Sequence, residues 1–121
     1  MNWTYILIIS VVVVVFLMRK RAGQLSSKDA LAHLKNGALV IDVRSPGEFN
    51  SGHLLNAINL PLEKIETALP LRVKNRNQLL LLHCQSGMRS GIAKRRLTGL
   101  GYVNAFNLGS YARAAKIVSL N

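Results

Sequence analysis

Four consecutive leucines, Leu79–Leu82, restrict the fold more than any other stretch of the chain. A strand that is apolar at every position must be buried on both faces, which is typical of the interior of a parallel sheet. Short apolar runs bounded by turn residues recur at regular intervals, with helical patterns between them. We expect strands over Ala38–Val43, Ala57–Leu60, Gln78–His83 and Val103–Leu108. The alternation predicts an α/β fold, a parallel sheet with helices on both faces.

Helices are expected where capping residues open a periodic segment and glycine or proline closes it. The patterns predict helices over Lys28–Lys35, Leu62 to about Leu69 with Pro70 as its limit, Ser90–Leu100 and Tyr111–Leu120, and a short turn over Glu48–Asn50.

The N-terminal stretch differs from the rest because Trp3–Met18 carries no charge. As a helix these residues span roughly 24 Å, a little less than the ~30 Å hydrocarbon core of a bilayer. Aromatic residues stand at one end, and Arg19–Arg21 follow the other, where long cations can reach the interface. We expect residues 1–21 to be an N-terminal transmembrane anchor with a basic flank, and residues 22–121 to be the folded domain.

Two other structures are possible for this stretch. A cleaved signal peptide would have basic residues before the apolar run and small residues after it, and here the basic residues follow. A buried helix of a soluble domain would have an amphipathic pattern, which the five valines do not give. The positive-inside rule then predicts a single-pass membrane protein with its N-terminus outside and the domain in the cytoplasm.

The net charge of +11 would suit a nucleic-acid-binding protein, but its distribution does not. The basic residues are scattered, and no aromatic residues interleave with them as stacking platforms. Attraction to anionic lipid headgroups and to small anionic substrates explains the charge as well. Nucleic acid is therefore an unlikely partner. The chain has a single cysteine, which excludes an internal disulfide and suits a reducing compartment.

That cysteine, Cys84, comes directly after the central strand. Ligands of open α/β sheets bind just beyond the carboxyl ends of the strands. The loop between Cys84 and the next helix includes Gly87, so it can turn several backbone N–H groups towards one point, as an anion-binding nest does. A helix N-terminus and a nearby arginine lower the pKa of a thiol. A small buried hydrophobe is the alternative role for a free cysteine. The polar loop favours a reactive thiol.

Four motifs in order give the chain a resemblance to the rhodanese family over essentially all of Leu25–Leu120. The active loop C-x-x-G-x-R-[ST] is matched by Cys84, Gly87, Arg89 and Ser90. Upstream, D-V-R is matched by Asp42–Arg44, and E-F-x-x-G-H with the A-x-N-L-P that follows is matched between Glu48 and Pro61. The tail G-[YF]-x-x-V-x-x-L-x-G-G departs at Ala105 and at Ser110, which stands at the second glycine.

The resemblance implies a rhodanese-like fold with a roughly five-stranded parallel sheet and a persulfide intermediate on Cys84. The expected activity is that of a thiosulfate sulfurtransferase. It would move sulfur from a small anionic donor such as thiosulfate to a thiol or cyanide acceptor. Related phosphatases and arsenate reductases have one more residue in the loop, whereas four residues separate Cys84 from Arg89, which favours sulfur. The alternative function is a membrane-tethered persulfide relay that serves protein donors and acceptors with little turnover of thiosulfate.

The expected substrate-binding residues are those of the loop: Gln85, Ser86, Gly87, Met88, Arg89 and Ser90. We expect Arg89 to brace the loop by bonding its carbonyls, although its guanidinium could face the anion instead. We expect Ser90 to cap the helix, and its hydroxyl could also reach the sulfur. Asp42 and Arg44 support the site, either by shaping the pocket or through an ion pair such as Arg44 with Glu48. His83 should point to the opposite face from Cys84. Three dispersed histidines do not have metal-ligand spacing, so neither a metal nor another cofactor is expected.

Overall fold

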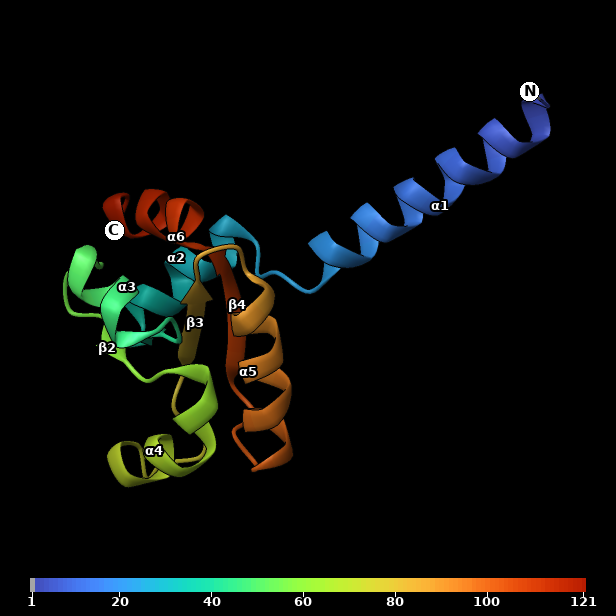
Figure 1. Ribbon diagram of the computed structural model, residues 1–121. Coiled ribbons are helices and arrows are strands. Elements are labelled where there is room, and N and C mark those ends of the chain that lie inside the picture. The colour runs from blue at the N-terminus through green and yellow to red at the C-terminus, as the bar shows by residue number, and fades with distance from the viewer. Residues whose placement is uncertain (1) are drawn as a thin grey trace.

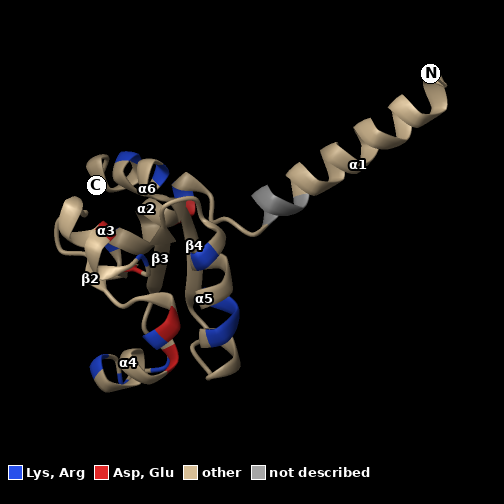
Figure 2. Ribbon diagram, in the orientation of Figure 1, with Lys and Arg blue, Asp and Glu red and all other residues tan. Residues whose placement is uncertain are grey.

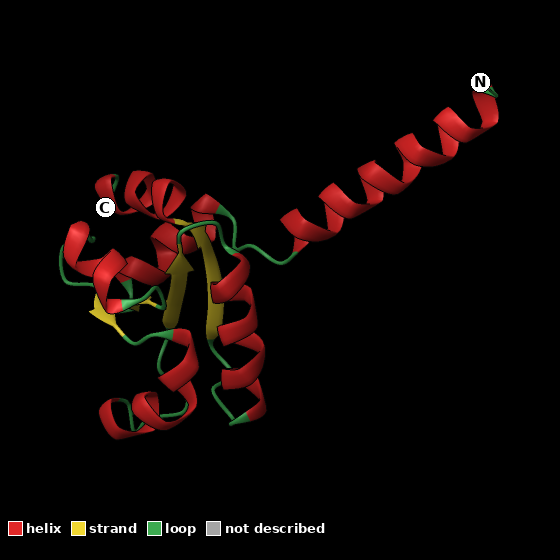
Figure 3. Cartoon of the chain, in the orientation of Figure 1, coloured by secondary structure: helices red, strands yellow, loops and turns green. Residues whose placement is uncertain are grey.

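One helix stands apart from a body in which helices and strands alternate (Figures 1 and 3). The computed structural model describes residues 2–121, and the side chains of all of them except 19–22. The elements in chain order are α1 (Trp3–Ala22), α2 (Ser27–Lys35), β1 (Leu39–Asp42), α3 (Pro46–Ser51), β2 (Ile58–Asn59), the 3-10 turn η1 (Leu62–Lys64), α4 (Ile65–Arg72), β3 (Leu80–Cys84), α5 (Met88–Gly99), β4 (Ala105–Ser110) and α6 (Tyr111–Ser119).

The sheet is parallel throughout, with strand order β2-β1-β3-β4. The leucine-rich strand β3 lies between β1 and β4, and every one of its residues is buried. The expected parallel α/β architecture is confirmed, but the sheet has four strands, so the expectation of roughly five was wrong. At the outer edge of β4 the chain contributes one backbone hydrogen bond, from Leu25 N to the Asn107 carbonyl at 2.9 Å. One hydrogen bond is not enough to make the segment around Leu25 a fifth strand.

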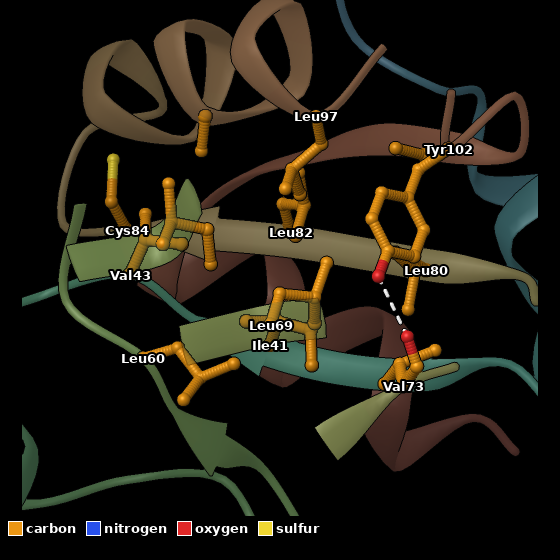
Figure 4. Packing of buried hydrophobic residues seen from close by; sticks show 13 residues of the cluster. Ile41, Val43, Leu60, Leu69, Val73, Leu80, Leu82, Cys84, Leu97 and Tyr102 are labelled. Atoms are coloured by element: carbon orange, nitrogen blue, oxygen red, sulfur yellow. Dashed lines mark hydrogen bonds between the residues drawn. The ribbon is translucent and has the colours of Figure 1, made fainter. Parts of the chain in front are cut away.

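The two faces of the sheet bury two separate apolar clusters. Ile41, Leu80 and Leu82 point towards α4 and α5, in the cluster that also holds Cys84 and Tyr102 (Figure 4). Leu81 and Leu108 point to the opposite face, where Ala30 of α2 and Ala114 and Ile117 of α6 cover them. Because side chains alternate along a strand, neighbours in β3 serve different clusters. The side chains of His83 and Cys84, the last two residues of β3, therefore lie on opposite faces of the sheet.

The expected helices are all present, with small shifts at their ends. The turn expected at residues 48–50 is the six-residue helix α3, which begins with Pro46 and is capped by Ser45. Pro70 does not end its helix, since α4 continues through it to Arg72. In the last part of the chain, Ser110 accepts a hydrogen bond from Arg113 N and caps α6. Ser110, which replaces the second glycine of the family motif, is thus the N-cap of the last helix.

Helix α1 projects away from the domain, and its large apolar side chains between Trp3 and Met18 are 40% to 80% exposed (Figure 1). Within residues 2–121, no helix combines the length and the apolar character that crossing a membrane requires. The transmembrane anchor expected over residues 1–21 is therefore not supported. The uncharged part of the helix ends at Met18, which leaves it shorter than the ~20 apolar residues that a span needs.

Candidate active site

Cys84 is the last residue of β3, and the chain turns back towards its sulfur directly after it. The backbone N–H of Gly87 donates to Sγ of Cys84 at 3.0 Å. Gly87 has φ +94°, a left-handed conformation that residues with a side chain rarely adopt, and α5 begins at the next residue. Cys84 itself is fully buried. The loop thus holds the sulfur between the sheet and the N-terminus of a helix.

Two opposing effects act on the thiol of Cys84. Burial raises its pKa, while the hydroxyl of Ser90 and the backbone N–H groups of Ser90, Gly87 and Ser86 lower it. The balance leaves the pKa of Cys84 below its ordinary value. A lowered pKa increases the fraction of thiolate, which is the nucleophilic form. The geometry therefore favours a reactive thiol over an inert buried one.

Ser90 lies beneath the loop and is fully buried. Its hydroxyl is 3.5 Å from Sγ of Cys84 and 2.7 Å from Oδ1 of Asn107 on β4. The expectation that Ser90 caps the helix was wrong: the N-cap position of α5 is Gly87, where no side chain makes a capping bond. The other role that the sequence allowed is confirmed, because the hydroxyl reaches the sulfur within a buried polar cluster.

The side chain of Arg89 extends from the loop towards α3. Its two terminal nitrogens donate to the two carboxylate oxygens of Glu48, at 2.6 and 2.8 Å. The hydrogen bond from Arg89 lowers the pKa of Glu48 to about 2, although partial burial opposes it. Glu48 also accepts the backbone N–H of Ser45 at 3.1 Å, so one carboxylate caps α3 and holds the loop arginine. Arg89 was expected to bond loop carbonyls, and it binds this carboxylate instead.

Asp42 and Arg44 form a buried ion pair at the carboxyl end of β1. Arg44 donates to Asp42 from Nε and from a terminal nitrogen, the latter at 2.7 Å. The same guanidinium donates to the carbonyl of Gly52 at 2.7 Å and lies 4.4 Å above the ring centre of Tyr111. The hydrogen bond to Asp42 raises the pKa of Arg44. The ion pair of Arg44 with Glu48 that the sequence suggested was wrong. Arg44 pairs with Asp42, and the carboxylate of Glu48 binds Arg89.

Arg44 also reaches the active loop, where its second terminal nitrogen is 3.4 Å from Oε1 of Gln85. The loop residues Gln85, Ser86 and Met88 are exposed, and Arg89 is partly so. Beyond Met88 an open pocket of about 510 Å³ runs along α5, where Lys94 and Arg95 form part of its wall. Basic residues line much of α5 on the outside of the domain (Figure 2). Lys94 and Arg95 therefore place positive charge in a pocket next to the active loop.

His83 lies on the other side of the sheet from Cys84, as expected, and faces the ring of Tyr111. It is fully buried, and neither ring nitrogen has a hydrogen-bond partner. Burial lowers the pKa of His83, although the Asp42 carboxylate, 3.8 Å away, opposes that effect. Within residues 2–121, no group of three or more His, Cys, Asp or Glu side chains is placed to hold a metal ion.

Asn107 and Tyr111 were not singled out from the sequence as site residues, and Glu48 was considered only as a partner of Arg44. Glu48 had a signal, since Ser45 and Glu48 have the spacing of a capping box. Asn107 had a weaker one, because a buried amide within an apolar strand requires partners. Tyr111 had none, because its position over Arg44 depends on how α6 packs against the end of the sheet.

The fold and the loop together define the class of protein. Residues 26–113 match the rhodanese-like domain family, and the chain belongs to it. The match includes the whole sheet and helix α5, which follows the loop.

Individual relatives agree with this assignment. The chain is 35% identical over 69 residues to the thiosulfate sulfurtransferase PspE of Escherichia coli K12. That match covers 57% of this chain and 66% of the relative, so the chain spans just under two thirds of that protein. Among solved structures, a rhodanese with anions from E. coli superposes with a TM-score of 0.62 at 31% identity, over 64% of this chain and 91% of that one. The human single-domain sulfurtransferase TSTD1 gives a TM-score of 0.66 at 26% identity, over 78% and 96% of the two chains.

Proposed function

We propose that this chain is a sulfurtransferase that carries sulfur as a persulfide on Cys84. The observation that supports this most directly is the 3.0 Å hydrogen bond from the N–H of Gly87 to Sγ, within a loop that lowers the thiol pKa. The sulfurtransferase names of PspE and TSTD1 support the same activity.

The first half-reaction is a displacement at sulfur. The thiolate of Cys84 attacks the outer sulfur of thiosulfate, a new S–S bond forms, and the S–S bond of the donor breaks. Sulfite leaves with the electron pair of that bond, and the outer sulfur remains as the terminal atom of a Cys84 persulfide anion. Backbone N–H groups aimed at the sulfur stabilise the negative charge without having to reorganise.

The second half-reaction returns the enzyme to its starting state. A nucleophilic acceptor, such as cyanide or a thiolate, attacks the terminal sulfur, and the thiolate of Cys84 is the leaving group. A low thiol pKa assists this step because it makes Cys84 a better leaving group. The cations of the nearby pocket, Lys94 and Arg95, favour the approach of anionic donors and acceptors.

The experiment is a steady-state assay of thiocyanate formation from thiosulfate and cyanide, with wild type and Cys84→Ser. We expect turnover by wild type and none by the variant, because a hydroxyl cannot accept sulfane sulfur. Intact-mass analysis after incubation with thiosulfate should show an adduct of one sulfur atom on wild type alone. Equal rates in the two proteins would exclude the proposal. A sulfur adduct without turnover would indicate that the chain is a persulfide relay that needs a protein acceptor, and not a thiosulfate sulfurtransferase.

A membrane location is a further part of this proposal. Between Trp3 and Met18 the apolar side chains of α1 project into solvent, where their exposure is costly, and Arg19–Arg21 follow them in the sequence. We propose that this helix attaches the chain to the surface of a membrane, with the domain on the cytoplasmic side. Cell fractionation of the full chain and of a variant lacking residues 2–18 tests the attachment, and protease digestion of sealed vesicles tests the side. Recovery of the full chain in the soluble fraction would contradict it.

A further inference from the structure

The short segment that follows α1 is fixed to the edge of the sheet. The backbone N–H of Leu25 donates to the carbonyl of Asn107 on β4 at 2.9 Å. The guanidinium of Arg113 on α6 donates to the carbonyls of both Leu25 and Leu108, so it joins the segment to the same strand at a second point. The preceding residue, Gln24, is therefore held close to β4 although it belongs to no helix or strand.

The side chain of Gln24 lies against two glycines at the active site. Gly87 and Gly109 both have positive φ, at +94° and +100°. A Cβ on Gly87 would stand 3.1 Å from Nε2 of Gln24, and a Cβ on Gly109 would stand 3.3 Å from Cδ and Nε2 of the same side chain. The amide of Gln24 thus covers the side of each glycine on which other residues carry a side chain.

Gly87 carries an N–H that binds the sulfur of Cys84. That N–H donates to Sγ at 3.0 Å, and the carbonyl of Gly87 accepts from Nδ2 of Asn107 at 3.1 Å. Glycine has access to more backbone conformations than other residues, so without packing around it the N–H could turn away from the sulfur. Gln24 and the backbone of Gly109 cover its remaining side. These contacts keep the N–H directed at the sulfur.

We infer that Gln24 is a positioning residue for Cys84, which acts by packing its side chain against Gly87. It holds the glycine so that the N–H of Gly87 stays directed at Sγ. Donors that are fixed beforehand stabilise an anion better than mobile ones, because they do not have to reorganise when the charge develops. The segment that attaches α1 thus forms one wall of the active loop. The inference rests on the proposed role of Cys84 and adds a residue outside the loop that supports it.

The test measures ionisation of Cys84 by the pH dependence of its alkylation with iodoacetamide. Cys84 is the only cysteine, so the reaction reports on it alone. In Gln24→Ala the N–H of Gly87 is less restricted and binds the thiolate less well. The midpoint of the alkylation profile should rise by about half a pH unit, since a whole hydrogen bond to a charged group is worth about one unit or more. A midpoint that does not rise would overturn the inference.

Two further variants separate packing at the loop from other causes. Gln24→Met retains the length of the side chain and should keep the wild-type midpoint, because contacts with a glycine are van der Waals contacts. Gln78→Ala is the matched control: Gln78 is half-buried like Gln24, but its amide donates to the carbonyl of Gly37 at 3.1 Å, beyond the opposite end of β3 from Cys84. Its midpoint should also match wild type. A rise in either variant as large as that in Gln24→Ala would overturn the inference.

The outcome is independent of the proposed function. Alkylation requires neither a sulfur donor nor an acceptor, so a chain without sulfurtransferase activity would still give a result. Urea unfolding at each pH identifies the range in which every variant is folded, and within that range a loss of stability does not move the midpoint. Failure of the sulfur-transfer assay would thus count against the activity, and an unchanged midpoint in Gln24→Ala would count against the role of Gln24.

Discussion

Glu48 and Arg89 lie 41 residues apart in the chain, and both carboxylate oxygens of Glu48 accept from the guanidinium of Arg89. The pairing joins α3 to the active loop. Bidentate contacts between an arginine and a carboxylate fix direction as well as distance. Because Glu48 also caps α3 through Ser45, a change at this carboxylate affects the helix start and the loop together.

Glu48→Gln should lower kcat/KM for sulfur transfer by roughly tenfold, because a neutral amide holds the arginine less firmly and the loop loses its fixed position. Stability should change by less than about 1 kcal/mol, because the ion pair is about one-third exposed. Steady-state kinetics and urea unfolding measure the two effects. Glu66→Gln is the control: its pair with Arg96 is more exposed and lies outside the site, so its kinetics should match wild type.

Gly87→Ala should disable the loop. An added Cβ would lie 3.4 Å from the backbone of Gly109 and 3.1 Å from the side chain of Gln24, in a residue with φ +94°. Left-handed backbone at a non-glycine residue costs about 1–3 kcal/mol, and relief of that strain moves the N–H away from the sulfur. We expect a lower melting temperature and slower alkylation of Cys84 at pH 6.

Gly99→Ala is the matched control for that variant. A Cβ at this position, at the end of α5, meets nothing within 4 Å. Alanine favours helix by up to about 1 kcal/mol over glycine, so stability should be equal or higher and alkylation unchanged. A loss of reactivity in both variants would mean that the effect does not come from the loop.

Tyr102→Phe should destabilise the domain by about 1–2 kcal/mol. The buried hydroxyl donates to the Val73 carbonyl at 2.6 Å and connects the end of α4 to the core (Figure 4). The change leaves that carbonyl without its partner while the ring packing remains. Urea unfolding gives the difference, with Tyr5→Phe as a control, because Tyr5 is 63% exposed in α1. Equal stability of the two variants would show that the bond contributes nothing.

His83 should make the domain less stable at acid pH. Burial lowers its pKa in the folded protein, while the unfolded chain binds a proton near pH 6.5. Below that pH the unfolded state therefore holds more protons, and the free energy of unfolding falls by at most about 1.4 kcal/mol per pH unit. His83→Leu should flatten this dependence between pH 7 and pH 5. His53→Leu should retain it, because the exposed His53 ring packs on Phe49.

Much of the architecture was predictable because the strands and helices have strong local patterns. The leucine run of β3 is buried at every position in the structure, as its composition predicts. Cys84 could be placed at the active edge because parallel strands end on one side of the sheet. The number of strands could not be predicted. Leu25 makes only one backbone hydrogen bond to β4, and the local sequence does not distinguish such a segment from a short edge strand.

The partners of the charged residues were harder to predict than their positions. Sequence spacing made Arg44 and Glu48 plausible partners, but Arg44 bonds the carboxylate two residues before it, and Glu48 bonds an arginine from another part of the chain. Which pair forms depends on how α3 docks against the loop, and this is a tertiary property. The same holds for Ser90, whose capping position is taken by Gly87 and whose hydroxyl is turned towards β4.

The backbone bond between Leu25 and Asn107 ties the chain directly after α1 to the edge of the sheet. Only Gly23 and Gln24 separate that attachment point from the end of α1, a reach of about 10 Å when extended. Whatever surface holds α1 therefore lies a short distance from the strand beneath Cys84. A sulfur carrier confined to that surface would encounter the loop at a high local concentration, as two sites joined by a short tether do. Its delivery would then depend on geometry more than on diffusion through bulk solution.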